Sequence, residues 1–118
     1  MAIINRAIID QGGENFTHEV VTVPSGSSYA ITTIMICNTY DPNALNPEAQ
    51  TSVFDLHFIP AGNALDVTTT CVVRRLQLPA GETFTFDSEK IILGEGDKVV
   101  IVGGTPANLA ATVSYLEV

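Results

Sequence analysis

The chain has 118 residues, of which 46% are hydrophobic and 15% are charged, so a single domain over residues 1–118 with an apolar core is expected. Five basic and thirteen acidic residues give a formal net charge of -8, which argues against direct binding to nucleic acid or to an anionic membrane surface. Residues 1–6 lack the features of an export signal, and no stretch reaches the ~20 apolar residues of a membrane-spanning helix. We therefore expect a protein that is made in a cytoplasm, is not secreted and does not enter a membrane.

The N-terminal segment 1–13 contains two apolar doublets, Ile3-Ile4 and Ile8-Ile9, and ends in the chain breaker at 11–13. This pattern predicts an extended arm that pairs at the edge of this domain or of a neighbouring subunit. The alternative is that the segment is simply the first strand of the domain. In either case Ile3, Ile4, Ile8 and Ile9 are candidate assembly contacts.

After this segment, β-branched and alternating residues predict a series of short strands. The clearest one places Phe54, Leu56 and Phe58 on one face, which is expected to lie in the core. The segments with strand character are 16–23, 29–37, 53–59, 67–78, 82–86, 91–93, 98–102 and 109–118. About eight strands at this spacing favour an all-β antiparallel sandwich of jelly-roll type.

Three turns repeat one pattern of an apolar residue, Pro, a small residue and Gly, at 23–26, 59–62 and 78–81. Proline at the second position and glycine at the fourth are typical of a type I turn. The repetition predicts strands that are joined by tight turns, which leaves little room for a long helix.

The longest stretch without strand character is 38–50, in which 42–50 is expected to contain at most one helical turn. Long loops in compact domains are often functional. Tyr40, Asp41, Pro42 and Leu45 are therefore further candidate contacts with a partner.

The strand at 67–78 carries Arg74 and Arg75 in its middle, where a bulge or a bend is expected. Either arginine can meet a carboxylate of a partner through two hydrogen bonds. The alternative is that both face solvent or acidic residues of their own domain.

His57 lies two residues from Asp55 on the same face of a strand, so the pair can touch and can orient a base or form half of a metal site. A zinc site needs at least three ligands, and the spacing offers no second pair. The pair is therefore interpreted as polar side chains that face solvent. Cys37 and Cys71 lie in apolar runs and are interpreted as small buried thiols.

No other pattern in the sequence points to catalysis or to a cofactor. The serines near Gly26 are not in a nucleophile motif. The carboxylate pairs at 87–89 and 95–97 lie in turns and lack the spacing of an EF-hand calcium loop. We expect no enzymatic activity and no cofactor, and we assign no catalytic or metal-binding residue.

Several motifs together resemble small virion proteins of tailed bacteriophages, and they span nearly the whole chain. The last of them is the closing strand Val-Ser-Tyr-Leu-Glu, which follows a Gly-Glu-Gly-Asp turn. The segments that carry the resemblance are 8–13, 23–28, 34–39, 78–83, 92–99 and 110–117. The resemblance implies a β-sandwich structural component of the phage particle, and it transfers no catalytic residues.

On this basis we expect a capsid decoration, or cement, protein that forms a trimer or a higher ring and contacts the major capsid protein or other virion proteins. A tail, neck or baseplate accessory subunit is the alternative within this class, and a glycan-binding module for host recognition is the alternative outside it. A sugar site would bring an aromatic ring together with Asn or Asp in one groove. A structural subunit would instead expose an apolar strip.

Overall fold

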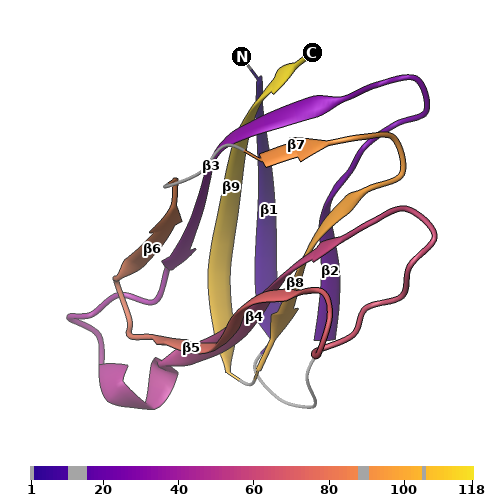
Figure 1. Ribbon diagram of the computed structural model, residues 1–118. Coiled ribbons are helices and arrows are strands. Elements are labelled where there is room, and N and C mark those ends of the chain that lie inside the picture. Colours follow the sequence, from indigo (N-terminus) through magenta and orange to yellow (C-terminus); the bar gives the residue numbers. More distant parts are fainter. Residues whose placement is uncertain (1, 11–15, 88–90, 105) are drawn as a thin grey trace.

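Two antiparallel sheets packed face to face make up the fold (Figure 1), which confirms the predicted all-β sandwich. The structure is a computed structural model and describes residues 2–10, 16–87, 91–104 and 106–118. The first sheet contains β1 (Ala2–Asp10), β9 (Ala107–Glu117), β3 (Tyr29–Asn38), β6 (Thr83–Phe86) and β7 (Ile91–Leu93). The second contains β2 (Phe16–Thr22), β8 (Lys98–Gly103), β4 (Ser52–Ile59) and β5 (Cys71–Leu78).

The sandwich is of the predicted jelly-roll type, and the structure supplies its strand order. The first sheet has the order β1-β9-β3-β6, with β7 also pairing with β3, and the second has the order β2-β8-β4-β5. When β6 and β7 are taken as one interrupted strand, the chain passes mostly from one sheet to the other between successive strands. This winding brings strands that are far apart in the sequence side by side, which is characteristic of double-sheet jelly rolls.

The core lies between the sheets because apolar residues alternate along the strands and point inward. Phe54 and Leu56 of β4 are almost fully buried, as predicted, and Phe58 is partly buried and packs against the core. The rings of Phe54 and Phe84 meet edge to face at 5.8 Å, which joins the two sheets. The other core residues with almost no exposed surface include Ile34, Ile36, Val99, Ile101, Leu109 and Val113.

The predicted N-terminal arm is the first strand of the domain's own sheet, which was the alternative interpretation. β1 pairs with β9 along its whole length, from Ala2 opposite Tyr115 to Asp10 opposite Ala107. It forms one edge of the first sheet (Figure 1). The end of the expected arm, residues 11–13, lies outside the described residues.

The repeated turns form where they were expected, but the turn begins one residue later than predicted. In each one the residue after the glycine donates its N–H to the carbonyl of the proline, as in the 3.2 Å bond from Ser27 to Pro24. Glycine is therefore the third residue of the turn, and φ is +80° at Gly26 and +81° at Gly62 and Gly81. A positive φ at this position is typical of a type II turn, so the predicted type I geometry is wrong.

The long loop after β3 contains the single helical turn that was expected, the 3-10 helix η1 (Pro47–Gln50). The buried side chain of Asn38 holds this loop, because its amide donates to the carbonyl oxygens of Gln50 at 2.8 Å and of Leu78 at 2.9 Å. Within the described ranges, no helix is long and apolar enough to cross a membrane.

Candidate functional site

The candidate site lies where the pairing of β4 with β5 is irregular. Between the regular pairs, β5 has more residues than β4: Arg74 and Arg75 lie opposite Asp55, and Val72 is an extra residue one step further along. Arg75 has a φ of 49°, in the left-handed region. Bulges of this kind bend a strand and change the direction of its side chains. The predicted bulge at Arg74 and Arg75 is therefore confirmed, and a second one follows it.

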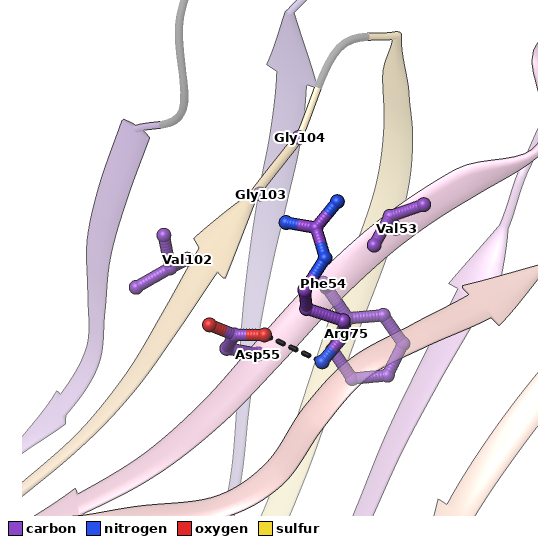
Figure 2. Close-up of a pocket in the computed structure, with 7 residues that line it drawn as sticks. All are labelled: Val53, Phe54, Asp55, Arg75, Val102, Gly103 and Gly104. Carbon is purple, nitrogen blue, oxygen red and sulfur yellow. Dashed lines mark hydrogen bonds between the residues drawn. The ribbon is translucent and has the colours of Figure 1, made fainter. Parts of the chain in front are cut away.

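The first bulge turns two donors toward the carboxylate of Asp55. The Arg74 guanidinium donates to Oδ2 at 2.6 Å, and the backbone N–H of Arg75 donates to Oδ1 at 2.6 Å (Figure 2). The Asp55 side chain is only 10% exposed, whereas that of Arg74 is 53% exposed. Arg74 thus meets an acid of its own domain, which was one of the two alternatives for this pair.

The side chain of Arg75 extends away from Asp55 and borders a shallow hollow (Figure 2). The hollow is also lined by Val53, Phe54, Val102, Gly103 and Gly104. Among the described residues that line the hollow, Asp55 and Arg75 are the charged ones, and Asp55 accepts two hydrogen bonds.

His57 is fully buried next to Asp55. Its Nδ1 lies 2.8 Å from Oγ1 of Thr70. That hydroxyl donates its single hydrogen to the carbonyl of Asp66 at 3.0 Å and accepts the N–H of the same residue at 3.1 Å. With the hydroxyl hydrogen on the Asp66 carbonyl, Nδ1 carries the ring proton and donates it to Thr70. In that tautomer Nε2 bears a lone pair.

That lone pair has no hydrogen-bond donor among the described residues, although the atom is buried. An unpaired buried polar atom costs about 1–3 kcal/mol, so native structures seldom keep one without a reason. Burial is also the main cause that lowers the pKa of His57, partly offset by the nearby Asp55 carboxylate. The ring is consequently neutral at pH 7.

Cys71 completes the cluster, because the second bulge places it opposite His57. The thiol is half-buried and donates to the carbonyl of Val73 at 3.2 Å. Burial raises its pKa, and the Asp55 carboxylate raises it further. One ligand atom each from Asp55, His57 and Cys71 lies within 4.8 Å of the other two, which is a set that can hold a metal ion.

A cysteine, a histidine and an aspartate also occur together in nucleophilic active sites, but the geometry here differs. In a catalytic relay the carboxylate orients the histidine through Nδ1, whereas here Nδ1 is bonded to Thr70. The raised pKa of Cys71 also disfavours the thiolate that would act as the nucleophile. The cluster therefore fits a ligand set better than a catalytic relay.

The sequence interpretation of Asp55 and His57 as a solvent-facing pair is wrong, since their exposures are 7% and 0%. Residues 60–70, between β4 and β5, supply Thr70 as the partner of the ring and Asp66 as the partner of the Thr70 hydroxyl, so the strand alternation alone did not reveal this cover. The expected strand at 67–78 begins only at Cys71, because backbone bonds to the Asp66 carbonyl form a turn up to Thr70. Sequence reasoning missed Cys71 as a neighbour of His57, since that contact depends on a register shift.

The isoleucines expected to be assembly contacts divide into two pairs. Ile3 and Ile9 are 62% and 65% exposed on the outer side of β1. Ile8 is fully buried in the core, and Ile4 packs against the core. Only Ile3 and Ile9 offer their side chains to a partner.

The candidate contacts in the long loop do not converge on the Asp55 cluster. Leu45 is 83% exposed, and the Tyr40 hydroxyl donates to its carbonyl at 2.9 Å. The Asp41 carboxylate accepts the N–H of Asn43 at 2.8 Å. The Pro42 ring packs so closely on Gly81 that a Cβ there would lie 2.8 Å from the ring. Hydrogen bonds within the loop and the packing of Pro42 on Gly81 hold the loop in place, and Leu45 is exposed to solvent.

The two acidic pairs that sequence analysis placed in turns have different outcomes. Both carboxylate oxygens of Asp97 accept backbone N–H groups, from Ala61 and from Gly94, each at 2.8 Å. Glu95 accepts the N–H of Gly26 at 2.7 Å and the hydroxyl of Ser25 at 3.1 Å. Both side chains hold turns together and are not gathered for an ion. In the other pair, residue 89 lies outside the described residues.

A second hollow places Phe58 beside Asp97, the combination that a sugar site would need. Both oxygens of Asp97 hold backbone N–H groups in place, and among the described residues that line this hollow no other side chain is polar. No family model, curated protein or solved structure matches the chain. What the protein does therefore has to follow from its own surfaces and residues.

Proposed function

We propose that the protein is a non-enzymatic structural component of a tailed-phage virion, and specifically a capsid decoration protein that associates with copies of itself and with the major capsid protein. The observation that carries the proposal is the outer face of the first sheet, which combines exposed apolar side chains with an absence of charge among its described strands. The resemblance of the sequence motifs to small virion proteins supports the same class. A tail, neck or baseplate subunit would use the same face.

The strand register defines this outer face. The residues opposite one another across β1, β9, β3 and β6 alternate between the core and the outside, and the outside positions are uncharged: small, hydroxylated, apolar or amide side chains. Five large apolar side chains on it are exposed by 41–65%: Ile3, Ile9, Met35, Ile92 and Leu116. The other outside positions are Asn5, Ala7, Ala30, Thr33, Cys37, Thr83, Thr85, Asn108, Ala110, Thr112 and Ser114.

A second copy of this chain is the occupant that fits the face best. Each copy carries a net charge of -8, so most contacts between two copies would bring acidic groups together. Like charges opposed across an interface cost several kcal/mol, whereas an uncharged sheet face avoids this repulsion. The mostly small side chains also allow a neighbouring copy to pack closely on this face, and such a contact closes into a ring when the neighbour offers a different patch.

The jelly-roll fold is compatible with this function. Double-sheet jelly rolls occur in viral capsid proteins and also in lectins and cupins, so the fold alone does not select a function. The outer face is what favours a structural role, since exposed apolar patches mark interaction surfaces.

Solution mass measured by light scattering after size exclusion, at several concentrations, tests the self-association. We expect a trimer or a higher ring for the natural chain. Ile9→Glu combined with Met35→Glu should reduce it to a monomer, because the double variant puts two acidic groups on the uncharged face that makes the contact. Leu45→Glu is the matched control, because its exposed side chain lies in the long loop, and it should leave the mass unchanged. Loss of assembly in the Leu45 variant alone would contradict the proposal.

Immunogold labelling of particles of the phage that encodes the chain tests its place in the virion. Regular labelling of the head supports a decoration protein. Labelling confined to the tail, neck or baseplate would favour the accessory subunit. If an antibody that recognises the purified chain does not label the particles, the assignment to the virion is overturned.

A further inference from the structure

We propose that Asp55, His57 and Cys71 bind one divalent metal ion of the zinc class, at the irregular pairing of β4 with β5. The inference is independent of the virion assignment, because it concerns a cluster on the other sheet. The three side chains offer an oxygen, a nitrogen and a sulfur ligand within 4.8 Å of one another. Zinc is bound by this mixture of ligand types, whereas calcium and magnesium require oxygen ligands.

The buried lone pair of His57 is the strongest sign of a ligand. Nε2 has no donor among the described residues, and the side chain is fully buried. The opposite nitrogen is hydrogen-bonded to the Thr70 hydroxyl, which in turn is held by both backbone groups of Asp66. A histidine that binds a metal through one nitrogen typically donates the other N–H to an acceptor that orients the ring. Thr70 fulfils this role for His57.

The carboxylate of Asp55 is also held in place by hydrogen bonds, as the His57 ring is. Its two oxygens each accept one hydrogen bond, from Arg74 and from the Arg75 backbone, and each keeps a further lone pair. Carboxylates that bind metals are commonly held by hydrogen bonds of this type. The exposed Arg74 side chain can also move into solvent when a cation binds.

Cys71 supplies the thiolate after it loses its proton to solvent. Its present donor bond to the Val73 carbonyl would be replaced by a sulfur–metal bond. In a tetrahedral zinc site the ligand atoms lie about 3.5 Å apart, so the cluster must contract by about 1 Å from its present span. Rotation of the half-buried Cys71 side chain can provide this movement. The fourth position would be taken by water, as in zinc sites with three protein ligands.

Titration of the reduced full-length chain with Co²⁺ tests the site, because cobalt reports its ligands by absorption. We expect one cobalt per chain, with a thiolate-to-metal charge-transfer band that Zn²⁺ abolishes on displacement. Cys71→Ser should remove the band and weaken binding at least tenfold. Cys37→Ser is the matched control, because Cys37 is the other half-buried thiol and lies on β3 of the opposite sheet, and it should keep both the band and the affinity.

Two further measurements distinguish a variant that no longer binds metal from one that no longer folds. Zn²⁺ at a hundredfold excess over Kd should raise the Tm of the natural chain by roughly 10 °C, with no such rise for Cys71→Ser. His57→Gln should also lose cobalt binding, and circular dichroism shows whether that variant is folded. The proposal is overturned if the natural chain binds no metal in one-to-one ratio, or if the Cys71 and Cys37 variants bind it equally well.

Discussion

At the scale of single residues, several polar side chains serve to tie turns and strands together. Glu95 is the clearest case, because it links the turn before β8 to the turn between β2 and β3 through Gly26 and Ser25. The N–H of Gly26 is the main cause that lowers the pKa of Glu95 below its ordinary value of 4.5, and the Ser25 hydroxyl adds to it. The carboxylate form is therefore favoured in the folded state.

The stability that Glu95 contributes should depend on pH. The folded chain holds the Glu95 proton less tightly than the unfolded chain does, so protonation favours unfolding. Its contribution is present above pH 4.5 and is lost as the pH falls through the lower folded-state pKa. Urea unfolding at several pH values should show a smaller loss of stability below pH 4.5 for Glu95→Gln than for the natural chain. Glu48→Gln, at an exposed position in η1, should keep the natural pH profile; equal profiles for the two variants would refute the role of Glu95.

The sequence predicted part of the Asp55 cluster and missed the rest for identifiable reasons. The two-residue spacing correctly placed Asp55 and His57 on one face of a strand. Their burial depends on Thr70, which the sequence pattern placed in a strand and the structure places in the turn before β5, so alternation predicted the wrong environment. The contact with Cys71 depends on a bulge, and a register shift of one residue reverses which face a side chain occupies.

At the scale of elements, β5 is the strand whose irregularities matter most. Two bulges lie on either side of Val73. One directs the Arg74 side chain and the Arg75 N–H to Asp55 of β4, and the other places Cys71 opposite His57. The bulge at the two arginines could be predicted, since adjacent charges interrupt an apolar strand. The second bulge has no comparable mark in the sequence.

Substitutions at Arg75 should reveal the cost of its backbone conformation. An L-residue in the left-handed region costs roughly 1–2 kcal/mol, and glycine avoids this cost. We expect Arg75→Gly to raise the free energy of unfolding by about 0.5 kcal/mol and Arg75→Val to lower it by about 1–2 kcal/mol, measured by urea unfolding. Gln77→Gly, on the same strand, should be destabilising by about 0.5–1 kcal/mol. A destabilisation of equal size at both glycine variants would contradict the left-handed conformation of Arg75.

At the scale of the whole molecule, the sandwich depends on a core shared by both sheets. Phe54 stands at its centre, almost fully buried and in edge-to-face contact with Phe84. The all-β class and most strand positions could be predicted because alternation is a local property. The pairing order could not be read from local patterns, since it joins strands such as β1 and β9 from opposite ends of the chain.

Truncation of a core residue and of an outer-face residue should therefore differ strongly. Phe54→Ala is expected to lower the free energy of unfolding by about 3–5 kcal/mol, because it removes buried apolar surface and leaves a cavity. Ile9→Ala, at an exposed position, should change it by less than about 0.5 kcal/mol under conditions in which the chain is monomeric. Urea unfolding followed by circular dichroism measures both. If Ile9→Ala strongly lowers the free energy of unfolding of the monomer, the Ile9 side chain belongs to the core of a single chain.

The pairing of β1 with β9 also sets the order of events when the chain is made. Ala2 lies opposite Tyr115, and the two ends of the chain meet at the same end of the sheet (Figure 1). Among the strands of this sandwich, β1 is made before the others and must wait for β9 before the hydrogen bonds between them can form. Folds dominated by such distant contacts close slowly, in milliseconds to seconds. During synthesis β1 is therefore an unpaired strand with apolar side chains, exposed to whatever else in the cell offers it an edge.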